Sequence, residues 1–305
     1  MSDSVVMGIS IDPQSIHSVT NTSSGREVYR NVQNCPDDSP KLLECLKQLV
    51  SSTVWRFGKI TTVVISVCEH LHTFRGSSNN RLSLVNAAQL AIDLSNHFGF
   101  DCSIVSASQA GFASDSNLLN AVDGAALSVS LDVGCSLSFY KDGKWSAQSL
   151  CRHWAHSPLP DFQWLIDGLT PVCRCGREAC IEQFLSIEGI ERQYHQVVLQ
   201  DKSLADIFSG VEEADIHSTR VYRAFIDQLA RSLLSPIEEL APKQLVLSGF
   251  ATAYPSLNKE LKVALSRYHS SESLPVIIQN SQDSFVFAYG AALMAIKNNN
   301  NHLRS

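Results

Sequence analysis

The sequence lacks any excess of positive charge: 24 lysines and arginines stand against 30 aspartates and glutamates, for a net charge of −6. Proteins that bind nucleic acid carry clustered Lys and Arg, and no basic stripe runs along this chain, so direct DNA binding is not expected. The sequence also lacks an apolar run of membrane-spanning length and a leader with a charged n-region before an apolar h-region. We therefore expect no membrane partner and a cytoplasmic protein.

The chain also lacks the even number of cysteines that a disulfide framework requires. The chain has nine cysteines, and an odd number without a secretion signal favours reduced thiols. Six of them are scattered and are interpreted as small buried apolar residues: Cys35, Cys45, Cys68, Cys102, Cys135 and Cys151. The other three form the most informative stretch of the chain.

These three cysteines have the spacing of a metal site. Cys173, Cys175 and Cys180 follow the pattern C-x-C-x4-C, and Glu182 lies just beyond the last thiol. Thiolates bind soft or borderline metals, and a fourth protein ligand would complete a tetrahedral zinc shell. Four protein ligands leave no position for water, so such a zinc would be structural. The alternative interpretation is a thiol cluster without metal.

Apolar patterning predicts a mixed α/β protein. Short β-branched runs alternate with stretches of helical periodicity. The predicted strands are residues 5–11, 60–67, 102–105, 125–131, 137–140, 244–248 and 275–279. The predicted helices are residues 39–49, 82–98, 221–240, 254–268 and 285–296, and residues 141–144 predict a hairpin turn.

A chain of 305 residues is long enough for two domains. We expect an N-terminal α/β domain over residues 1–115 and a C-terminal α/β domain with the metal loop over residues 116–297. The helix at residues 285–297 is expected to pack back on the first domain. The polar residues 298–305 are expected to form a flexible tail.

The segment Val172–Ser186 closely resembles the zinc loop of the ROK family (repressors, open reading frames and sugar kinases). The family loop reads C-x-C-G-x-x-G-C-[LIV]-E with a serine a few residues later, and only the second glycine differs here, as Ala179. The resemblance extends over essentially the whole chain and implies an actin-like or hexokinase-like ATPase fold, with two α/β domains around a cleft. Further matches are Gly8, Gly25, Phe98-Gly99, residues 244–249 and residues 289–293.

The resemblance also implies which residues hold the metal and a sugar. In the family an upstream histidine completes the metal site; His156 stands in its place, and His153 is close enough to compete. The gap from His156 to Cys173 is longer than usual, which implies an insertion around residues 161–168. The sugar-binding glutamate of the family is matched by Glu182, for which an exposed carboxylate at a helix start is the alternative.

Other family contacts have weaker counterparts. Asn79 or Asn80 matches a sugar-binding asparagine, with an ordinary polar loop residue as the alternative. Gly134 remains from the family's second phosphate loop and Gly249 from its adenosine region, so these two glycines are the candidate nucleotide contacts.

The positions that would carry catalysis depart from the family pattern. The family's first phosphate loop reads like G-I-D-I-G-G-T-K, whereas this chain has Ser10 for the acid and Asp12-Pro13 for the two glycines. Proline removes an amide donor, and Asp12 puts negative charge where phosphate should lie. The loop is therefore poorly suited to hold ATP and Mg²⁺.

The general base and the second phosphate loop differ too. Alignment from Gly99 puts Ala107 at the base position, and a slip of one residue would put Ser108 there; neither can replace a carboxylate, so no catalytic residue is assigned. The second phosphate loop, G-T-G-[IV]-G in the family, is Asp132–Ser136 here and keeps one glycine of three.

Three hypotheses follow. The first is a catalytically inactive pseudokinase that binds a hexose or N-acetylhexosamine or acts as a regulatory partner. The alternative is an active ATP-dependent kinase for glucose, N-acetylglucosamine or N-acetylmannosamine with a rearranged site, using Asp12 or Asp115 as base. A repressor is disfavoured because the first predicted strand leaves no room for a helix-turn-helix domain. The resemblance further implies a homodimer.

Overall fold

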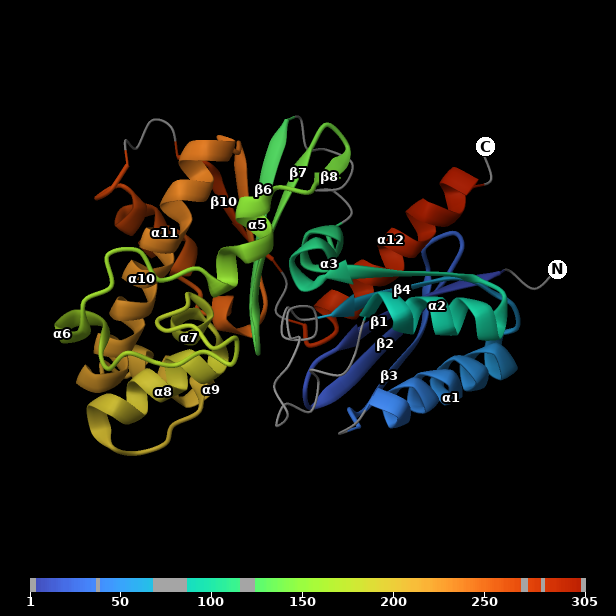
Figure 1. Cartoon of the computed structure of the whole chain (residues 1–305), viewed down its shortest axis with the longest axis horizontal. Coiled ribbons are helices and arrows are strands. Elements are labelled where there is room, and N and C mark those ends of the chain that lie inside the picture. The colour runs from blue at the N-terminus through green and yellow to red at the C-terminus, as the bar shows by residue number, and fades with distance from the viewer. Residues whose placement is uncertain are drawn as a thin grey trace. The chain divides into compact units, whose positions relative to one another are not determined.

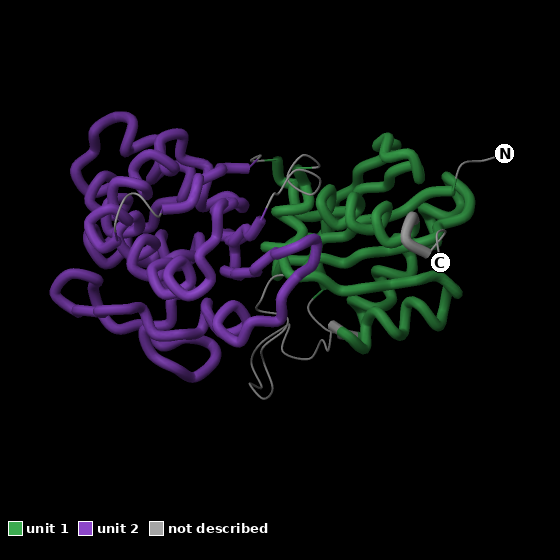
Figure 2. The backbone as a smooth tube through the Cα atoms, turned by 90° about the horizontal axis from the view of Figure 1, so that it is seen from above, with its two compact units in different colours: residues 1–121, 283–305 green, residues 122–282 purple. Residues whose placement is uncertain are grey.

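The computed structural model of the protein describes residues 4–36, 39–67, 87–115, 124–269, 274–280 and 283–302. The chain divides into two compact units, shown in Figure 2: unit 1 comprises residues 1–121 and 283–305, and unit 2 comprises residues 122–282. Each unit is built on one five-stranded sheet with helices (Figure 1), so the predicted α/β class is confirmed. Within the described residues, no helix is both long and apolar enough to cross a membrane.

Unit 1 contains the sheet β3-β2-β1-β4-β5. Its strands are β1 (Val5–Ile11), β2 (Ser15–Thr22), β3 (Glu27–Asn34), β4 (Ile60–Val67) and β5 (Asp101–Ser106). Its helices are α1 (Ser39–Phe57), α2 (Ala87–Phe98), α3 (Ala107–Ala113) and α12 (Val286–His302). Apolar residues of α1 and α2 pack on one face of the sheet, whereas α3 and α12 cover the other.

Unit 2 contains the sheet β10-β9-β6-β7-β8. Its strands are β6 (Ala125–Leu131), β7 (Cys135–Lys141), β8 (Lys144–Ser146), β9 (Gln244–Ser248) and β10 (Val276–Gln279). Its longer helices are α8 (Ile187–Val198), α9 (Leu204–Glu212), α10 (Ile216–Leu240) and α11 (Leu257–Leu265). Single turns complete it: α5 (Ser149–His153), η2 (Trp154–His156), α6 (Trp164–Asp167), α7 (Glu182–Leu185) and η3 (Phe250–Thr252).

The two sheets share one plan. In each, three antiparallel strands in succession (β1-β2-β3 and β6-β7-β8) are extended by two parallel strands on the side of the first strand. The hairpin after β1 therefore corresponds to the hairpin after β6. These two hairpins contain the positions at which the family resemblance puts the phosphate loops.

All seven predicted strands are present, and the predicted helices are present where the structure describes them. Strands β2, β3 and β8, helices α3, α8 and α9, and the single helical turns of unit 2 were not predicted. Helix α1 continues to Phe57, and α11 is shorter than the predicted 254–268. The predicted start of the second helix, residues 82–86, lies outside the described residues.

The end of the chain differs from the prediction. Helix α12 continues to His302, so residues 298–302 are helical and the prediction that the helix ends near Ile296 is wrong. The stretch contains no glycine or proline to stop the helix, and asparagine lowers helix propensity by only a fraction of a kcal/mol per residue.

Helix α12 lies close against β1 and α3 because glycines stand at the two contacts. A Cβ added to Gly8 of β1 would overlap backbone atoms of Ala288 and Ala292, and one added to Gly290 would overlap the carbonyl oxygen of Ala110. These neighbours are backbone atoms within regular elements, so they cannot move aside cheaply. The two glycines are therefore required for packing, with no ligand needed to explain them.

We expect Gly290→Ala to lower the free energy of unfolding of unit 1 by ~3 kcal/mol, because the helix must shift to admit a methyl group. The matched control is Gly99→Ala, where φ is +70° and nothing lies within 4 Å of an added Cβ; it should cost only ~1 kcal/mol. Urea unfolding of the two variants measures both values. Equal losses would contradict the packing role.

Candidate functional site

The segment from His156 to Ile181 forms a compact loop in unit 2 that gathers four potential metal ligands. Short antiparallel contacts at Pro158↔Cys180 and Val172↔Glu178 hold its two ends together. Backbone hydrogen bonds from Leu159 N to Ala179 O (2.8 Å) and from Cys173 N to Arg177 O (2.7 Å) fix the turns that carry the cysteines.

One ligand atom from each of His156, Cys173, Cys175 and Cys180 lies within 4.8 Å of the others. The Cys175 and Cys180 sulfurs are 3.6 Å apart, and so are the Cys173 sulfur and His156 Nδ1. Ligands held ~2.3 Å from a tetrahedral zinc lie ~3.8 Å from one another, so the spacing fits a four-coordinate metal. All four residues are buried except the partly exposed Cys175, which leaves little access for water.

The three thiols cannot all ionise together without a cation. Hydrogen bonding from Cys180, aided by His156, lowers the pKa of Cys173 to about 3, and the thiolate so formed raises the pKa of Cys180. Burial alone acts in the opposite direction, as at Cys151, where it raises the pKa to about 11. A divalent ion would supply the charge that three adjacent thiolates need. The donor set of three sulfurs and one imidazole fits a structural zinc.

The structure distinguishes between the two candidate histidines. His156 is buried and its Nδ1 faces the cysteines, whereas the His153 side chain is exposed and lies outside the cluster. His156 ends η2, and its carbonyl oxygen also accepts a hydrogen bond from Arg177 (3.3 Å). Of the two, His156 is therefore the residue positioned to hold a metal.

Ala179 occupies the position of the family's second glycine, and its backbone has the conformation that favours glycine. Its φ is +51°, in the left-handed region, and the residue is buried next to Cys180. A Cβ in this conformation costs ~1–2 kcal/mol. Ala179 therefore adds local strain to the loop.

Glu182 is fully buried at the start of α7, and its Oε2 accepts a hydrogen bond from the Cys135 amide at 3.4 Å. The alternative of an exposed carboxylate at a helix start is therefore wrong. The metal loop places this carboxylate next to the first residue of β7.

In the first hairpin, between β1 and β2, the Asp12 carboxylate binds the backbone of its own loop. Asp12 Oδ1 accepts hydrogen bonds from the amides of Gln14 and Ser15, both at 2.7 Å, and Oδ2 accepts one from the Ser15 hydroxyl at 2.6 Å. Backbone amides of this kind are what a phosphate loop offers to a nucleotide. Here a carboxylate of the chain already occupies them, and Pro13 offers no amide.

In the second hairpin, between β6 and β7, Asp132 has the same role. Its Oδ1 accepts from the Val133 amide at 2.9 Å, and its Oδ2 accepts from the Phe250 amide at 2.8 Å. Gly134 completes the turn by accepting a hydrogen bond from the Asp132 amide. Gly249 lies beside this carboxylate, and a Cβ on it would overlap the Leu131 carbonyl oxygen, which explains the glycine without a nucleotide.

The position at which the base is predicted holds an alanine side chain. Ala107 is the first residue of α3, is buried, and follows the N-cap Ser106, whose hydroxyl accepts a hydrogen bond from the Gln109 amide. Ser108 is fully buried in the same turn. Asn79, the predicted sugar contact, and Cys68 lie outside the described residues.

Sequence reasoning recognised the charge of Asp12 but missed its hydrogen bonds. The signal was present: an aspartate followed by a polar loop commonly bonds to amides two and three residues later. The contact between Asp132 and Phe250 spans 118 residues and has no local signal.

The chain is similar to known proteins in sequence and in fold. The sequence profile of the ROK family matches residues 6–298. A segment of 149 residues is 30% identical to N-acetyl-D-glucosamine kinase of Aliivibrio salmonicida (strain LFI1238), covering 47% of this chain and 48% of that protein. The matched segment thus spans about half the length of that relative.

Two solved structures show the fold. A ROK hexokinase from Thermus thermophilus has a TM-score of 0.74 at 16% identity, over 97% of this chain and 99% of that one. A ROK glucokinase from Streptomyces griseus, solved with glucose and AMPPNP, has a TM-score of 0.77 at 13% identity, over 96% and 99%. The predicted actin-like fold class is thereby confirmed.

We expect the purified protein to contain about one zinc per chain, as four protein ligands imply. His156→Ala should lose most of the metal and lower the melting temperature by about 10 °C or more, because a structural metal contributes directly to folding. His153→Ala is the matched control and should keep its metal. Elemental analysis with thermal unfolding tests this; metal lost from His153→Ala but kept by His156→Ala would contradict the assignment.

Ala179→Gly should stabilise the protein by ~1 kcal/mol, since glycine adopts a positive φ without the Cβ penalty. Ala253→Gly, at a residue with φ of −71°, is the control and should destabilise by a similar amount. Denaturant unfolding of the zinc-loaded variants should show a higher free energy of unfolding for Ala179→Gly and a lower one for Ala253→Gly. Destabilisation of both would mean that the loop is not strained.

Proposed function

Because the chain belongs to the ROK family, we propose that it is a sugar-kinase-like protein that has lost phosphoryl transfer and acts as a sugar-binding or regulatory protein. The observation that carries this proposal is the Asp12 carboxylate on the amides of Gln14 and Ser15. A γ-phosphate approaching this loop would have to displace a negatively charged group that is already hydrogen-bonded to it.

The second hairpin supports the same conclusion. Asp132 holds the amides of Val133 and Phe250, so both candidate phosphate loops are occupied by carboxylates of the chain itself. The aspartate carboxylate at each loop would repel a negatively charged triphosphate. It would also compete with the triphosphate for the backbone amide donors. Gly134 and Gly249, the candidate nucleotide contacts, both adjoin Asp132.

The residue at the predicted base position supports the same proposal. Ala107 cannot accept the proton of an attacking sugar hydroxyl, and the loss of a base alone removes ~10²–10⁴ in rate. Phosphoryl transfer depends on positioning and electrostatic stabilisation, both of which the two carboxylates oppose. We therefore assign no catalytic residue.

A sugar remains the proposed ligand. N-acetyl-D-glucosamine kinases are among the relatives, which favours an N-acetylhexosamine or a hexose. We propose Glu182 and His156 as its contacts, with Asn79 as a third. Glu182 is buried, so contact with a sugar requires that the carboxylate become accessible on binding.

The remaining parts of the proposal concern the metal, the cell compartment and the oligomeric state. His156 and the three cysteines would hold a structural zinc that orders the loop before Glu182. Thiols without disulfides suit the cytoplasm, and no disulfide links any two of the cysteines that the structure describes. A homodimer stays a prediction from the family resemblance.

A coupled assay for ADP release tests the loss of transfer. With ATP-Mg²⁺ and glucose, N-acetylglucosamine or N-acetylmannosamine, we expect no turnover above the buffer rate. Ala107→Asp should stay inactive, because restoring a carboxylate at the base position leaves both loops occupied. An active ROK kinase in the same assay is the positive control.

Turnover by the wild-type chain at more than ~1 s⁻¹, within the usual range for kinases, would establish the alternative of an active kinase with a rearranged site. Activity gained by Ala107→Asp alone would show that the loops still accept ATP. Either result contradicts the proposal.

A further inference from the structure

The stretch between His156 and Cys173 presents an apolar ridge on the surface of unit 2. Helix α6 and the residues after it carry Trp164, Leu165, Ile166 and Leu169, each between 64% and 74% exposed. Surface apolar residues are usually scattered singly, whereas these stand almost consecutively. The ridge coincides with the insertion that the long spacing between His156 and Cys173 implied.

Buried polar contacts hold the ridge in place. Asp167 within α6 is buried, and its Oδ1 lies 2.5 Å from Arg231 Nη2 and 3.2 Å from Gln228 Nε2, both on α10. Its Oδ2 accepts from the Gln163 amide at 2.9 Å, and Arg231 also donates to the Pro160 carbonyl oxygen. A ridge fixed in this way cannot bury its apolar side chains by collapsing onto the protein.

A hollow of about 600 Å³ lies beside the ridge, between it and helices α8 and α10. Leu199, which is 79% exposed, continues the apolar surface on its far side. With the four ridge residues it exposes on the order of 700 Å², compared with ~800 Å² on each side of a standard protein interface. The surface is large enough to be the centre of a binding site.

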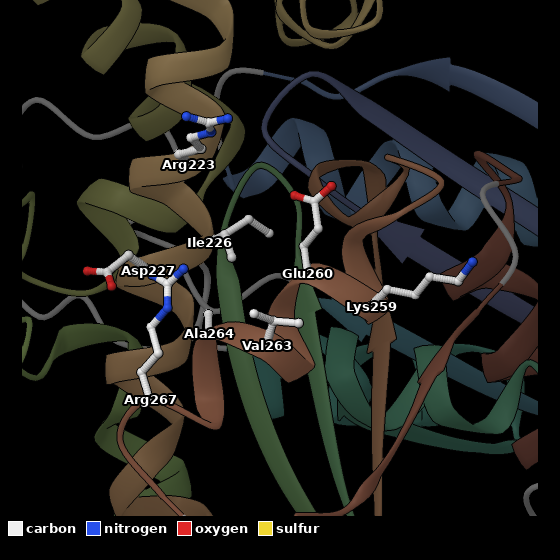
Figure 3. Close-up of a pocket in the computed structure, with 8 residues that line it drawn as sticks. All are labelled: Arg223, Ile226, Asp227, Lys259, Glu260, Val263, Ala264 and Arg267. Atoms are coloured by element: carbon white, nitrogen blue, oxygen red, sulfur yellow. The ribbon is translucent and has the colours of Figure 1, made fainter. Parts of the chain in front are cut away.

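The outer stripe of α10 adds positive charge next to this hollow. Arg220 lines the hollow, and Arg223 follows one helical turn later on the same stripe. Beyond it, a second hollow of about 440 Å³ lies between α10 and α11, where Arg267 extends toward α10 (Figure 3). No described residue forms an ion pair with Arg220, Arg223 or Arg267.

The nearby carboxylates already have partners. Asp227 accepts from Arg231 Nε at 2.9 Å and from the Tyr268 hydroxyl at 2.7 Å, and Glu260 accepts from the Ser256 hydroxyl at 2.6 Å. The arginines are therefore the groups left to meet a partner. In a chain of net charge −6, this gives the surface a local preference for acidic groups.

The charge pattern also argues against a second copy of this chain. A two-fold contact whose axis passes beside Arg220 and Arg223 would bring these like charges from both copies together. Juxtaposed like charges cost free energy at an interface. An acidic partner avoids this cost.

We propose that this surface binds an amphipathic helical segment of another protein, with apolar side chains beside Trp164 and Leu165 and carboxylates along Arg220 and Arg223. A helix laid in an apolar groove is a common mode of recognition. The inference goes beyond the proposed function and does not depend on it, since the surface would be the same on an active kinase.

The test uses two fluorescein-labelled helical peptides with the same leucine face, one with a glutamate polar face and one with a lysine polar face. Fluorescence anisotropy with the zinc-loaded chain should give a Kd of about 10 μM for the glutamate peptide, as for a weak transient contact, and at least ~10-fold weaker binding of the lysine peptide. The double variant Trp164→Ala/Leu165→Ser should weaken binding at least ~10-fold. Arg220→Glu/Arg223→Glu should reverse the preference between the peptides.

Matched controls are Trp55→Ala and Lys59→Glu, exposed residues of unit 1, which should leave binding unchanged. All the substituted residues are exposed, and unchanged circular dichroism and zinc content would confirm folding. Equal binding of both peptides, or none, overturns the proposal. Sedimentation showing a wild-type dimer that Trp164→Ala/Leu165→Ser converts to monomer would overturn it in favour of a second copy.

Discussion

In the β1–β2 hairpin and in the β6–β7 hairpin, an aspartate carboxylate accepts hydrogen bonds from backbone amides. The proposed loss of nucleotide binding depends on these hydrogen bonds. Asp12 follows β1 and Asp132 follows β6, and the two strands have the same place in two sheets of the same plan. Each carboxylate accepts two amides at 2.7–2.9 Å. The same amides cannot serve a phosphate at the same time, which is the physical basis of our proposal that the two hairpins do not hold a nucleotide.

The metal loop differs from the two hairpins in that its side chains are arranged as a metal site requires. Its four potential ligands are gathered and mostly buried, and its backbone has a positive φ at Ala179, where a glycine would be less strained. The loop leads directly into Glu182, and the part of it that carries the apolar ridge is tied to α10 by the contact between Asp167 and Arg231. A protein can lose the groups that act on a substrate and keep those that fold it, because stability and catalysis depend on different residues.

Sequence reasoning succeeded where the signal is local. The core strands are β-branched runs, and the spacing of Cys173, Cys175 and Cys180 is read directly from the chain. Strand β2 was missed because its residues are mainly Ser, Thr, Asn and His; they become buried only when α1 and α12 cover the sheet. The choice of His156 over His153 likewise depends on how η2 turns, which the sequence alone does not define.

The central claim is that carboxylates of the chain close both phosphate loops, and its most direct test is the binding of ATP-Mg²⁺ measured by isothermal titration calorimetry. The account predicts no detectable binding to the wild-type chain at millimolar nucleotide. It also predicts measurable binding once Asp12→Gly and Asp132→Gly free the amides together. Binding of ATP-Mg²⁺ to the wild-type chain at micromolar concentration would contradict the account.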